Sequence, residues 1–266
     1  MSKMPTSKMP DSKMPDSKML AGRVALVTGG SRGLGAAVAR ALADQGADVA
    51  ISYVASGDKA AAVVADLKAQ GVRAAAFRSD QADTAAAAPL IGRVMAEFGR
   101  LDILVNNAAI SVLGQTVDDP AADTARLDRL WQTNVAGAVA TTRAAAPVLS
   151  DGGRIVFIGS ALGSRVPFPG VADYAGSKAA IAGYARGAAR DLGPRNITVN
   201  VVQPGIMPTD MAAEVGDSVP DALMDLHPIR RIATLDEVAA LVCFLAGPHG
   251  GYMTGDVIDI AGGIQV

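Results

Sequence analysis

The sequence predicts a doubly wound α/β fold, in which helices cover both faces of one parallel sheet. Two observations predict it. Short runs rich in β-branched residues alternate with longer alanine-rich stretches from residue 20 onward, and this alternation is typical of strand–helix–strand units. Several of the short runs are continuously apolar, as expected of parallel strands that are buried on both faces.

Seven short apolar runs are predicted to be strands because glycine, proline or polar residues bound them. They lie at Val24–Thr28, Val49–Tyr53, Ala74–Phe77, Ile103–Val105, Ile155–Ile158, Ile197–Val202 and Val257–Ile260. The stretches between them are predicted to be helices near 33–45, 57–70, 83–98, 123–149, 172–192 and 235–246. Right-handed crossovers between successive strands then place helices on both faces of the sheet.

Composition excludes several classes of function. The formal net charge is −2 and no basic block is longer than two residues, so no nucleic-acid partner is expected. No apolar run approaches the ~18 residues of a membrane span. The one cysteine, Cys243, rules out an internal disulfide framework and favours a reducing, cytoplasmic location. With only His227 and His249 beside it, no metal site is expected.

The first eighteen residues repeat Ser-Lys-Met-Pro-x with a period of five and carry no apolar stripe. This segment lacks the apolar centre of a signal peptide. Residues 1–18 are predicted to be a flexible arm, with an expression leader or a duplicated start region as the alternative. No linker follows, so residues 19–266 are predicted to form a single domain.

A glycine-rich turn joins the first predicted strand to the first predicted helix. It reads Thr28-Gly29-Gly30-Ser31-Arg32-Gly33-Leu34-Gly35. Glycines at such a junction let the backbone turn tightly and approach a pyrophosphate, which the positive end of the helix stabilises. For this motif alone, an ordinary turn is the alternative.

Further motifs give the chain a resemblance to the classical short-chain dehydrogenase/reductase family over residues 20–266. The turn is similar to the family's TGxxxGxG, Asn106-Asn107-Ala108-Ala109 resembles its NNAG with alanine in the last place, and TGDVIDIAGG resembles its last strand. Asn134, Ser160, Tyr174 and Lys178 fall at the positions of its catalytic tetrad. The resemblance implies a Rossmann-type seven-stranded parallel sheet in a dinucleotide-binding domain, and reversible hydride transfer between nicotinamide and a carbonyl group.

NADPH/NADP+ is the expected cofactor, because the second predicted strand ends at Ser52-Tyr53-Val54-Ala55-Ser56 without an acidic residue. A carboxylate there would bind both ribose hydroxyls of NAD, whereas Arg32 can pair with a 2′-phosphate. A solvated surface arginine is the alternative for Arg32. The expected cofactor-binding residues are Gly29, Ser31, Arg32, Gly33, Leu34, Gly35, Ser52, Tyr53, Ser56, Asp80, Gln81, Asn106, Ala108, Tyr174, Lys178, Pro204, Gly205, Ile206, Thr209 and Met211. By resemblance, Asp80 holds the adenine and the segment 204–211 closes over the nicotinamide.

Tyr174 and Lys178 are the expected acid–base pair. They are four residues apart on a predicted helix, so both project from one face. The pKa of a free phenol is about 10, and a nearby ammonium is expected to lower it toward the operating range. Ser160 is expected to donate to the substrate carbonyl, with Ser164 as the alternative because the interval to Tyr174 is one residue longer than the family usually has. By resemblance, Asn134 holds a water on the proton path.

Substrate choice is expected to reside in Ala161–Asp173 and Ile206–Leu226. The first segment carries the apolar residues Leu162, Val166, Phe168 and Val171, and neither concentrates arginine. We therefore expect an NADPH-dependent reductase of a small, largely neutral ketone, or dehydrogenase of the matching secondary alcohol.

Two other functions stay open. One is the 3-oxoacyl-[acyl-carrier-protein] reductase of fatty-acid synthesis. Arg195 matches one carrier-docking position of that branch, but Ala140 stands at the other. The second, from a different class, is a catalytically silent nucleotide-binding sensor or scaffold. By resemblance, a homotetramer is expected.

Overall fold

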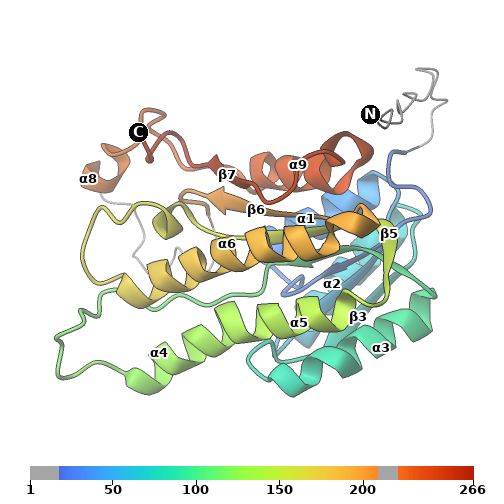
Figure 1. Ribbon diagram of the computed structural model, residues 1–266, viewed down its shortest axis with the longest axis horizontal. Coiled ribbons are helices and arrows are strands. Elements are labelled where there is room, and N and C mark those ends of the chain that lie inside the picture. The colour runs from blue at the N-terminus through green and yellow to red at the C-terminus, as the bar shows by residue number, and fades with distance from the viewer. Residues whose placement is uncertain (1–17, 209–220) are drawn as a thin grey trace, which may run out of the picture.

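The computed structural model describes residues 18–208 and 221–266. In this part of the chain, seven strands form one parallel sheet in the order β3-β2-β1-β4-β5-β6-β7 (Figure 1). The strands are β1 Val24–Val27, β2 Asp48–Tyr53, β3 Ala74–Arg78, β4 Leu101–Asn106, β5 Leu149–Ile158, β6 Thr198–Pro204 and β7 Val257–Ile260. The predicted seven-stranded parallel sheet is confirmed.

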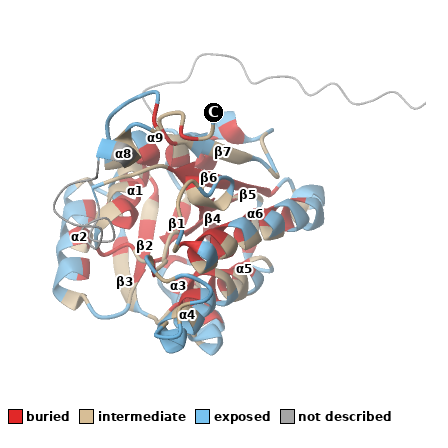
Figure 2. Cartoon of the chain, turned by 90° about the vertical axis from the view of Figure 1, so that its left-hand side faces the viewer, coloured by how far each residue is buried: buried red, intermediate tan, exposed pale blue. Residues whose placement is uncertain are grey.

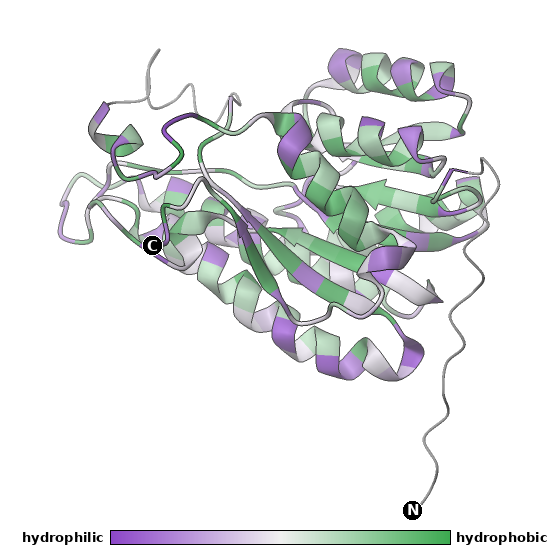
Figure 3. Cartoon of the chain, turned by 90° about the horizontal axis from the view of Figure 1, so that it is seen from above, coloured by the Kyte–Doolittle hydropathy of each residue, from purple (hydrophilic) through white to green (hydrophobic). Residues whose placement is uncertain are grey.

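Helices cover both faces of this sheet. One core cluster holds the buried sides of α1 (Gly33–Asp44), α2 (Gly57–Ala69) and α9 (Leu235–Ala246). A second holds those of α3 (Ala87–Phe98), α5 (Ala138–Ala145) and α6 (Ala172–Leu192). Figure 2 shows buried residues along the central strands and on the helix faces turned toward them, and Figure 3 shows the same strands as largely hydrophobic. The remaining α-helices of the described residues are α4 (Thr124–Trp131) and the short α8 (Asp221–Met224).

The structure corrects the predicted helix over 123–149. α4 is followed by a π-helical turn, η2 (Gln132–Gly137), and then by α5, which ends at Ala145. The turn lies tightly against the segment that follows β3, since a Cβ at position 137 would lie 1.8 Å from the carbonyl oxygen of Gln81. β5 also begins earlier than predicted, because Leu149 pairs with Leu101 ahead of a register shift.

The sheet order fixes where a ligand site can form. From β1 the chain first builds outward through β2 and β3, and then returns to place β4 on the other side of β1. Ligands of doubly wound sheets bind in the crevice outside the carboxyl ends of the strands at this reversal. None of the helices described is both long and apolar enough to cross a bilayer. Residues 1–17 of the predicted arm lie outside the described residues.

Candidate active site

A cleft of about 420 Å³ opens at the carboxyl ends of β1, β2 and β4. It is continuous from the glycine-rich turn to the start of α6. The predicted site residues that line it are Gly29, Ser31, Arg32, Gly33, Leu34, Gly35, Ser52, Tyr53, Ser56, Asp80, Gln81, Ala108, Tyr174 and Lys178. The structure therefore brings most of the predicted site into one cavity.

The glycine-rich turn needs glycine for two reasons. Gly29 and Gly33 have φ angles of 66° and 52°, in the left-handed region that favours glycine. At Gly35, a Cβ would lie 2.4 Å from the carbonyl oxygen of Gly29 and 2.5 Å from Nδ2 of Asn107. The turn thus brings bare backbone and the N-terminus of α1 to the cleft, which is the cradle that a pyrophosphate requires.

The turn after β4 is fastened to the turn after β1. Thr28 Oγ1 accepts hydrogen bonds of 3.1 Å from the backbone N–H groups of Asn107 and Ala108, and Asn107 Nδ2 donates to the carbonyl oxygens of Thr28 (2.9 Å) and Gly29 (3.2 Å). Asn106 does not line the cleft. It is buried in β4 and donates from Nδ2 to Thr142 Oγ1 at 3.0 Å. The expectation for Asn106 is therefore corrected, and its neighbour Asn107 takes the place at the cleft.

The end of β2 forms the wall beside Arg32. Ser52 is buried, and its Oγ accepts a 3.3 Å hydrogen bond from the Gly29 N–H. Tyr53 and Ser56 line the same wall, and no acidic side chain stands between Ser52 and Ser56. Arg32 is exposed and directly precedes α1. This wall fits a phosphorylated ribose better than a free one, because it offers hydroxyls and a guanidinium and no carboxylate.

Tyr174 and Lys178 lie in the first two turns of α6 and are both buried. Lys178 Nζ donates a 2.9 Å hydrogen bond to the carbonyl oxygen of Ile158. The Ser160 side chain hydrogen-bonds that of Tyr174. Ser164, the alternative, instead donates to Oε1 of Gln203 at 2.9 Å. Ser160 is thus the serine that contacts Tyr174.

Burial controls the charge of this pair. It raises the pKa of Tyr174, and the hydrogen bond from Ser160 offsets only part of the effect. It lowers the pKa of Lys178 to about 8. The sequence-based expectation was that the lysine would lower the pKa of the tyrosine; in the structure, burial raises that pKa, and the opposing contribution comes from Ser160. At neutral pH, Tyr174 is a neutral phenol that can give up a proton.

Asn134 lies in the π-helical turn and is buried. Its Oδ1 accepts from the Ile110 N–H at 2.9 Å, and its Nδ2 donates to the Ile110 carbonyl oxygen at 2.9 Å and to Ser177 Oγ at 3.2 Å. Ser177 Oγ in turn donates to the carbonyl oxygen of Tyr174 at 2.7 Å. The Asn134 side chain therefore connects Ile110, in the cleft wall, to Ser177 of α6, which itself hydrogen-bonds the backbone of Tyr174.

The segment after β6 is only partly at the cleft. Pro204 is buried at the end of β6, and Gly205 and Ile206 line a separate cavity of about 110 Å³ together with His227. Met207, which no motif singled out, lines the main cleft. Thr209 and Met211 lie outside the described residues.

Sequence reasoning missed other lining residues of the cleft. They are Val54, Ala55, Ser79, Asn107, Ala109, Ile110, Arg129, Thr133, Ile158, Gly159 and Met207. Asn107 and Ala109 belong to a motif that was already recognised, and Ile158 and Gly159 directly precede Ser160. Arg129 and Thr133 carried no signal, because they reach the cleft only through the folding of α4 and η2.

The apolar residues of the expected substrate segment differ in burial. Leu162 packs with Tyr174, but Val166 is 56% exposed. The segment is held by the last residues of the sequence: Arg165 Nη1 donates to the carbonyl oxygens of Ile264 and Val266, and Gln265 Nε2 donates to that of Ala161 at 2.7 Å.

Several known proteins are similar to this chain over nearly its whole length. Residues 29–265 match the family model described as enoyl-(acyl carrier protein) reductase. The cyclic-di-GMP-binding biofilm dispersal mediator protein of Escherichia coli K12 is 42% identical over 241 residues, which cover 91% of this chain and 96% of that protein. A 3-oxoacyl-[acyl-carrier-protein] reductase of Staphylococcus aureus Mu50 is 36% identical over 244 residues, covering 91% of this chain and 98% of that protein. The structure of a short-chain dehydrogenase from Burkholderia cenocepacia J2315 in complex with NADP is 48% identical, with a TM-score of 0.88, and covers 93% of this chain and all of that one.

Proposed function

The chain belongs to the short-chain dehydrogenase/reductase family of oxidoreductases, and from this we propose that it is an NADPH-dependent reductase of a small, largely neutral ketone, working reversibly as a secondary-alcohol dehydrogenase. The observation that carries the proposal is that one cleft joins a phosphate-binding turn to the buried Tyr174–Lys178 pair. A dinucleotide lying in it would have its phosphates at one end and its reactive ring at the other.

NADPH rather than NADH is supported by the groups around Arg32. The bare backbone at Gly29 and Gly35 leaves room for a pyrophosphate. The wall from Ser52 to Ser56 has no carboxylate to repel a 2′-phosphate. The related Burkholderia cenocepacia dehydrogenase was solved with NADP. When bound, the reduced cofactor supplies the hydride that reduces the carbonyl carbon.

The protein's own part is to hold the substrate and move a proton. Tyr174 is the general acid, which gives its hydroxyl proton to the substrate oxygen as the carbonyl becomes an alcohol. Ser160 hydrogen-bonds Tyr174 and is placed to donate to the same substrate oxygen, where negative charge develops. Lys178, anchored on Ile158, stabilises the phenolate left on Tyr174 until a proton returns. In alcohol oxidation the same groups act in the reverse order.

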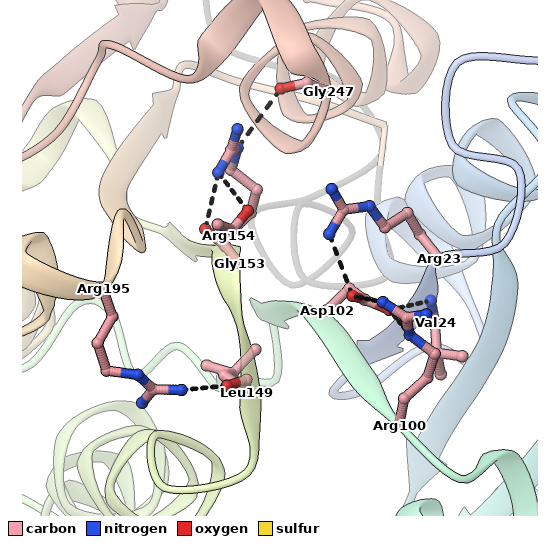
Figure 4. A network of polar contacts seen from close by, with 10 residues as sticks. Arg23, Val24, Arg100, Asp102, Leu149, Gly153, Arg154, Arg195 and Gly247 are labelled. Atoms are coloured by element: carbon pink, nitrogen blue, oxygen red, sulfur yellow. Dashed lines mark hydrogen bonds and ion pairs between the residues drawn. The ribbon is translucent and has the colours of Figure 1, made fainter. Parts of the chain in front are cut away.

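A neutral ketone is favoured over a carrier-bound oxoacyl group by the state of Arg195. Its Nε donates to Asp151 Oδ1 at 2.8 Å, and one terminal nitrogen donates to the carbonyl oxygen of Ala146. The other terminal nitrogen donates to the carbonyl oxygen of Leu149 (Figure 4). A guanidinium engaged in this way offers little to an acidic carrier. Ala140 supplies no second cation. The 3-oxoacyl reductase remains the alternative that the Staphylococcus aureus relative favours.

The experiment is a comparison of initial rates of NADPH and NADH oxidation with free cyclic and aryl ketones, a 3-oxoacyl thioester and an enoyl thioester. Turnover of the ketones with NADPH, and little with either thioester, supports the proposal. Fast turnover of the 3-oxoacyl thioester alone assigns the alternative. Reduction of the enoyl thioester alone rejects carbonyl chemistry.

A sensor or scaffold is the alternative from a different class, and a relative is named for binding cyclic di-GMP. Titration of this chain with cyclic di-GMP and with NADPH separates the two. Cyclic di-GMP binding without turnover of any carbonyl would favour the sensor. We also propose that the protein is cytoplasmic and forms a homotetramer. Light scattering after size-exclusion chromatography tests the oligomeric state by measuring the mass of the assembly.

A further inference from the structure

Arg129 and Asp80 form an ion pair in the lining of the cleft. Arg129 Nη2 donates to both carboxylate oxygens of Asp80, at 2.9 Å to Oδ2 and 3.2 Å to Oδ1. Both residues line the cleft. Their side chains are 50% and 37% exposed, and ion pairs with such exposure contribute little to folding stability. A role toward a ligand explains the pair better than a role in the fold.

The pair leaves the Asp80 carboxylate oriented and ionised. Oδ1 also accepts a 3.0 Å hydrogen bond from the Ala82 N–H. Burial acts to raise the pKa of Asp80, but the hydrogen bonds from Arg129 and Ala82 together lower it below its usual value. A carboxylate has about four lone-pair sites, so this one keeps capacity for a further N–H donor from a ligand.

The neighbouring residue adds a second polar group. Gln81 is 8% exposed, lines the cleft, and its Nε2 is buried with no hydrogen-bond partner in the structure. A buried amide N–H without a partner is costly unless a ligand or water satisfies it. That nitrogen is buried rather than open to the cleft, so the Asp80 carboxylate is the group of this segment that can meet the amino group of adenine, a donor that suits this acceptor.

Arg129 is itself held in place by the π-helical turn. Its carbonyl oxygen accepts a 2.8 Å hydrogen bond from Thr133 Oγ1. The same turn lies against the Gln81 carbonyl through Gly137, where no side chain would fit. The helix that carries Arg129 is therefore held in a fixed position relative to the segment that carries Asp80 and Gln81.

We propose that Arg129 is a positioning residue for the adenine end of the cofactor: it holds the Asp80 carboxylate so that this group accepts a hydrogen bond from the adenine amino group. The inference rests on the proposed function, because it requires NADPH to lie in the cleft with its adenine toward Asp80. It adds to that function a residue that determines cofactor affinity from a helix outside the nucleotide-binding motifs.

The test measures binding of three probes to the full chain: NADPH, adenosine 2′,5′-bisphosphate and reduced nicotinamide mononucleotide. We expect Arg129→Met to weaken NADPH and the bisphosphate by about tenfold, the effect of losing roughly 1.4 kcal/mol, with the mononucleotide unchanged. Arg129→Lys keeps the charge but loses the fork geometry, so its effect is smaller. Arg126→Met, an exposed change on the same helix outside the cleft, serves as the matched control with no effect on any probe.

A second readout separates positioning from a merely structural role. Arg129→Met should raise the KM for NADPH while kcat at saturating NADPH stays within about twofold, because the reacting groups are untouched. Combined with Asp80→Asn, its effect on bisphosphate affinity should be less than additive.

An unchanged affinity of Arg129→Met for the bisphosphate overturns the inference. So does an equal loss for all three probes together with a lower melting temperature, which would assign Arg129 to the fold. If the unchanged protein binds neither NADPH nor the bisphosphate, the proposed function fails first and the inference with it.

Discussion

The ammonium nitrogen of Lys178 lies 5.7 Å from the centre of the Tyr174 ring, and both side chains are buried. This separation puts the lysine close enough to stabilise a phenolate, but its Nζ is bonded to the Ile158 carbonyl oxygen rather than to the phenol. The pair therefore rests as a neutral phenol beside a cation that is easily deprotonated. Such a resting state suits proton donation to a substrate oxygen.

Tyr174→Phe should abolish turnover and keep NADPH binding. The change removes the proton donor and nothing else of comparable size, and general acid catalysis typically contributes about 10²- to 10⁴-fold. The measurement is the rate of ketone-dependent NADPH oxidation beside a fluorescence titration of NADPH. Tyr184→Phe, on the same helix and packed edge-on against Phe157, is the control and should keep its rate. Unchanged turnover in Tyr174→Phe would reject Tyr174 as the acid.

Lys178 should make stability depend on pH in the alkaline range. Burial lowers its pKa from 10.5 to about 8. Between these values the unfolded chain holds a proton that the native state has released, so the free energy of unfolding rises with pH. Relative to Lys178→Met, the protein should gain up to roughly 3 kcal/mol across this window, at about 1.4 kcal/mol per pKa unit.

The comparison is made by urea unfolding at several pH values between about 8 and 10. Tyr174, whose pKa burial raises, acts in the opposite direction, but only above its ordinary value of about 10. A constant difference between the two proteins from pH 8 to 10 would contradict the lowered pKa of Lys178. Lys178→Met should also lose most of its activity, because the cation that stabilises the phenolate is then absent.

The sheet, the glycine-rich turn and the Tyr174–Lys178 pair could be predicted from the sequence, because each depends on a local pattern of residues. Continuous apolar runs identify buried parallel strands, and a spacing of four on a helix places two side chains on one face. The sequence could not choose between Asn106 and Asn107. One of two adjacent residues must face the core, and only the packing of Thr142 against β4 decides which.

Long-range packing explains the other differences. No residue in 123–149 predicts a π-helical turn, which lies where Gly137 meets Gln81, a residue far away in the sequence. Pro147 stands two residues beyond the end of α5. Arg129 also reaches the cleft through long-range packing. The raised pKa of Tyr174 could not be predicted from the sequence either. The spacing shows that a lysine is near, but it does not show how completely water is excluded from both groups.

Arg32→Ala should reduce the preference for NADPH. A charge-assisted hydrogen bond contributes about 1.5–3 kcal/mol, so the affinity for NADPH should fall by about tenfold to a hundredfold, while that for NADH changes little. Arg40→Ala is the control. That residue lies on α1 outside the cleft, paired with Asp66 at 2.8 Å. Equal losses for the two cofactors would show that Arg32 does not read the 2′-phosphate.

Asp102 should be the carboxylate whose loss most destabilises the amino-terminal edge of the sheet, which lies opposite to the carboxyl ends of the strands and the cleft. It is fully buried at the start of β4, where it accepts hydrogen bonds from Arg23 (3.1 Å), Arg100 (2.7 and 2.8 Å) and the Val24 N–H (2.9 Å) (Figure 4). Asp102→Ala leaves these donors without their acceptor, at a cost of about 2–3 kcal/mol in the free energy of unfolding.

The matched control for Asp102 is Asp66→Ala, an exposed ion-pair partner whose loss should cost less than about 1 kcal/mol. Burial raises the pKa of Asp102, but the hydrogen bonds from Arg100, Val24 and Ser150 lower it below its usual value. Its contribution is therefore present above pH ~4 and is lost as the pH falls through the lowered pKa. Equal destabilisation by the two substitutions would contradict this account. NADPH affinity should not change.

Gly137→Ala should damage both fold and site, whereas Gly92→Ala should be harmless. A Cβ at Gly137 would lie 1.8 Å from the Gln81 carbonyl oxygen, so η2 must move away from the segment that carries Asp80. Because η2 also carries Asn134, we expect a loss of several kcal/mol in the free energy of unfolding together with weaker NADPH binding. At Gly92, in the middle of α3, nothing lies within 4 Å of a new Cβ, and alanine there should stabilise the helix by about 0.5–1 kcal/mol. Thermal unfolding of the two variants gives shifts of opposite sign if the contact of Gly137 with Gln81 determines the π-helical turn. Full stability and NADPH affinity in Gly137→Ala would show that the turn adapts without it.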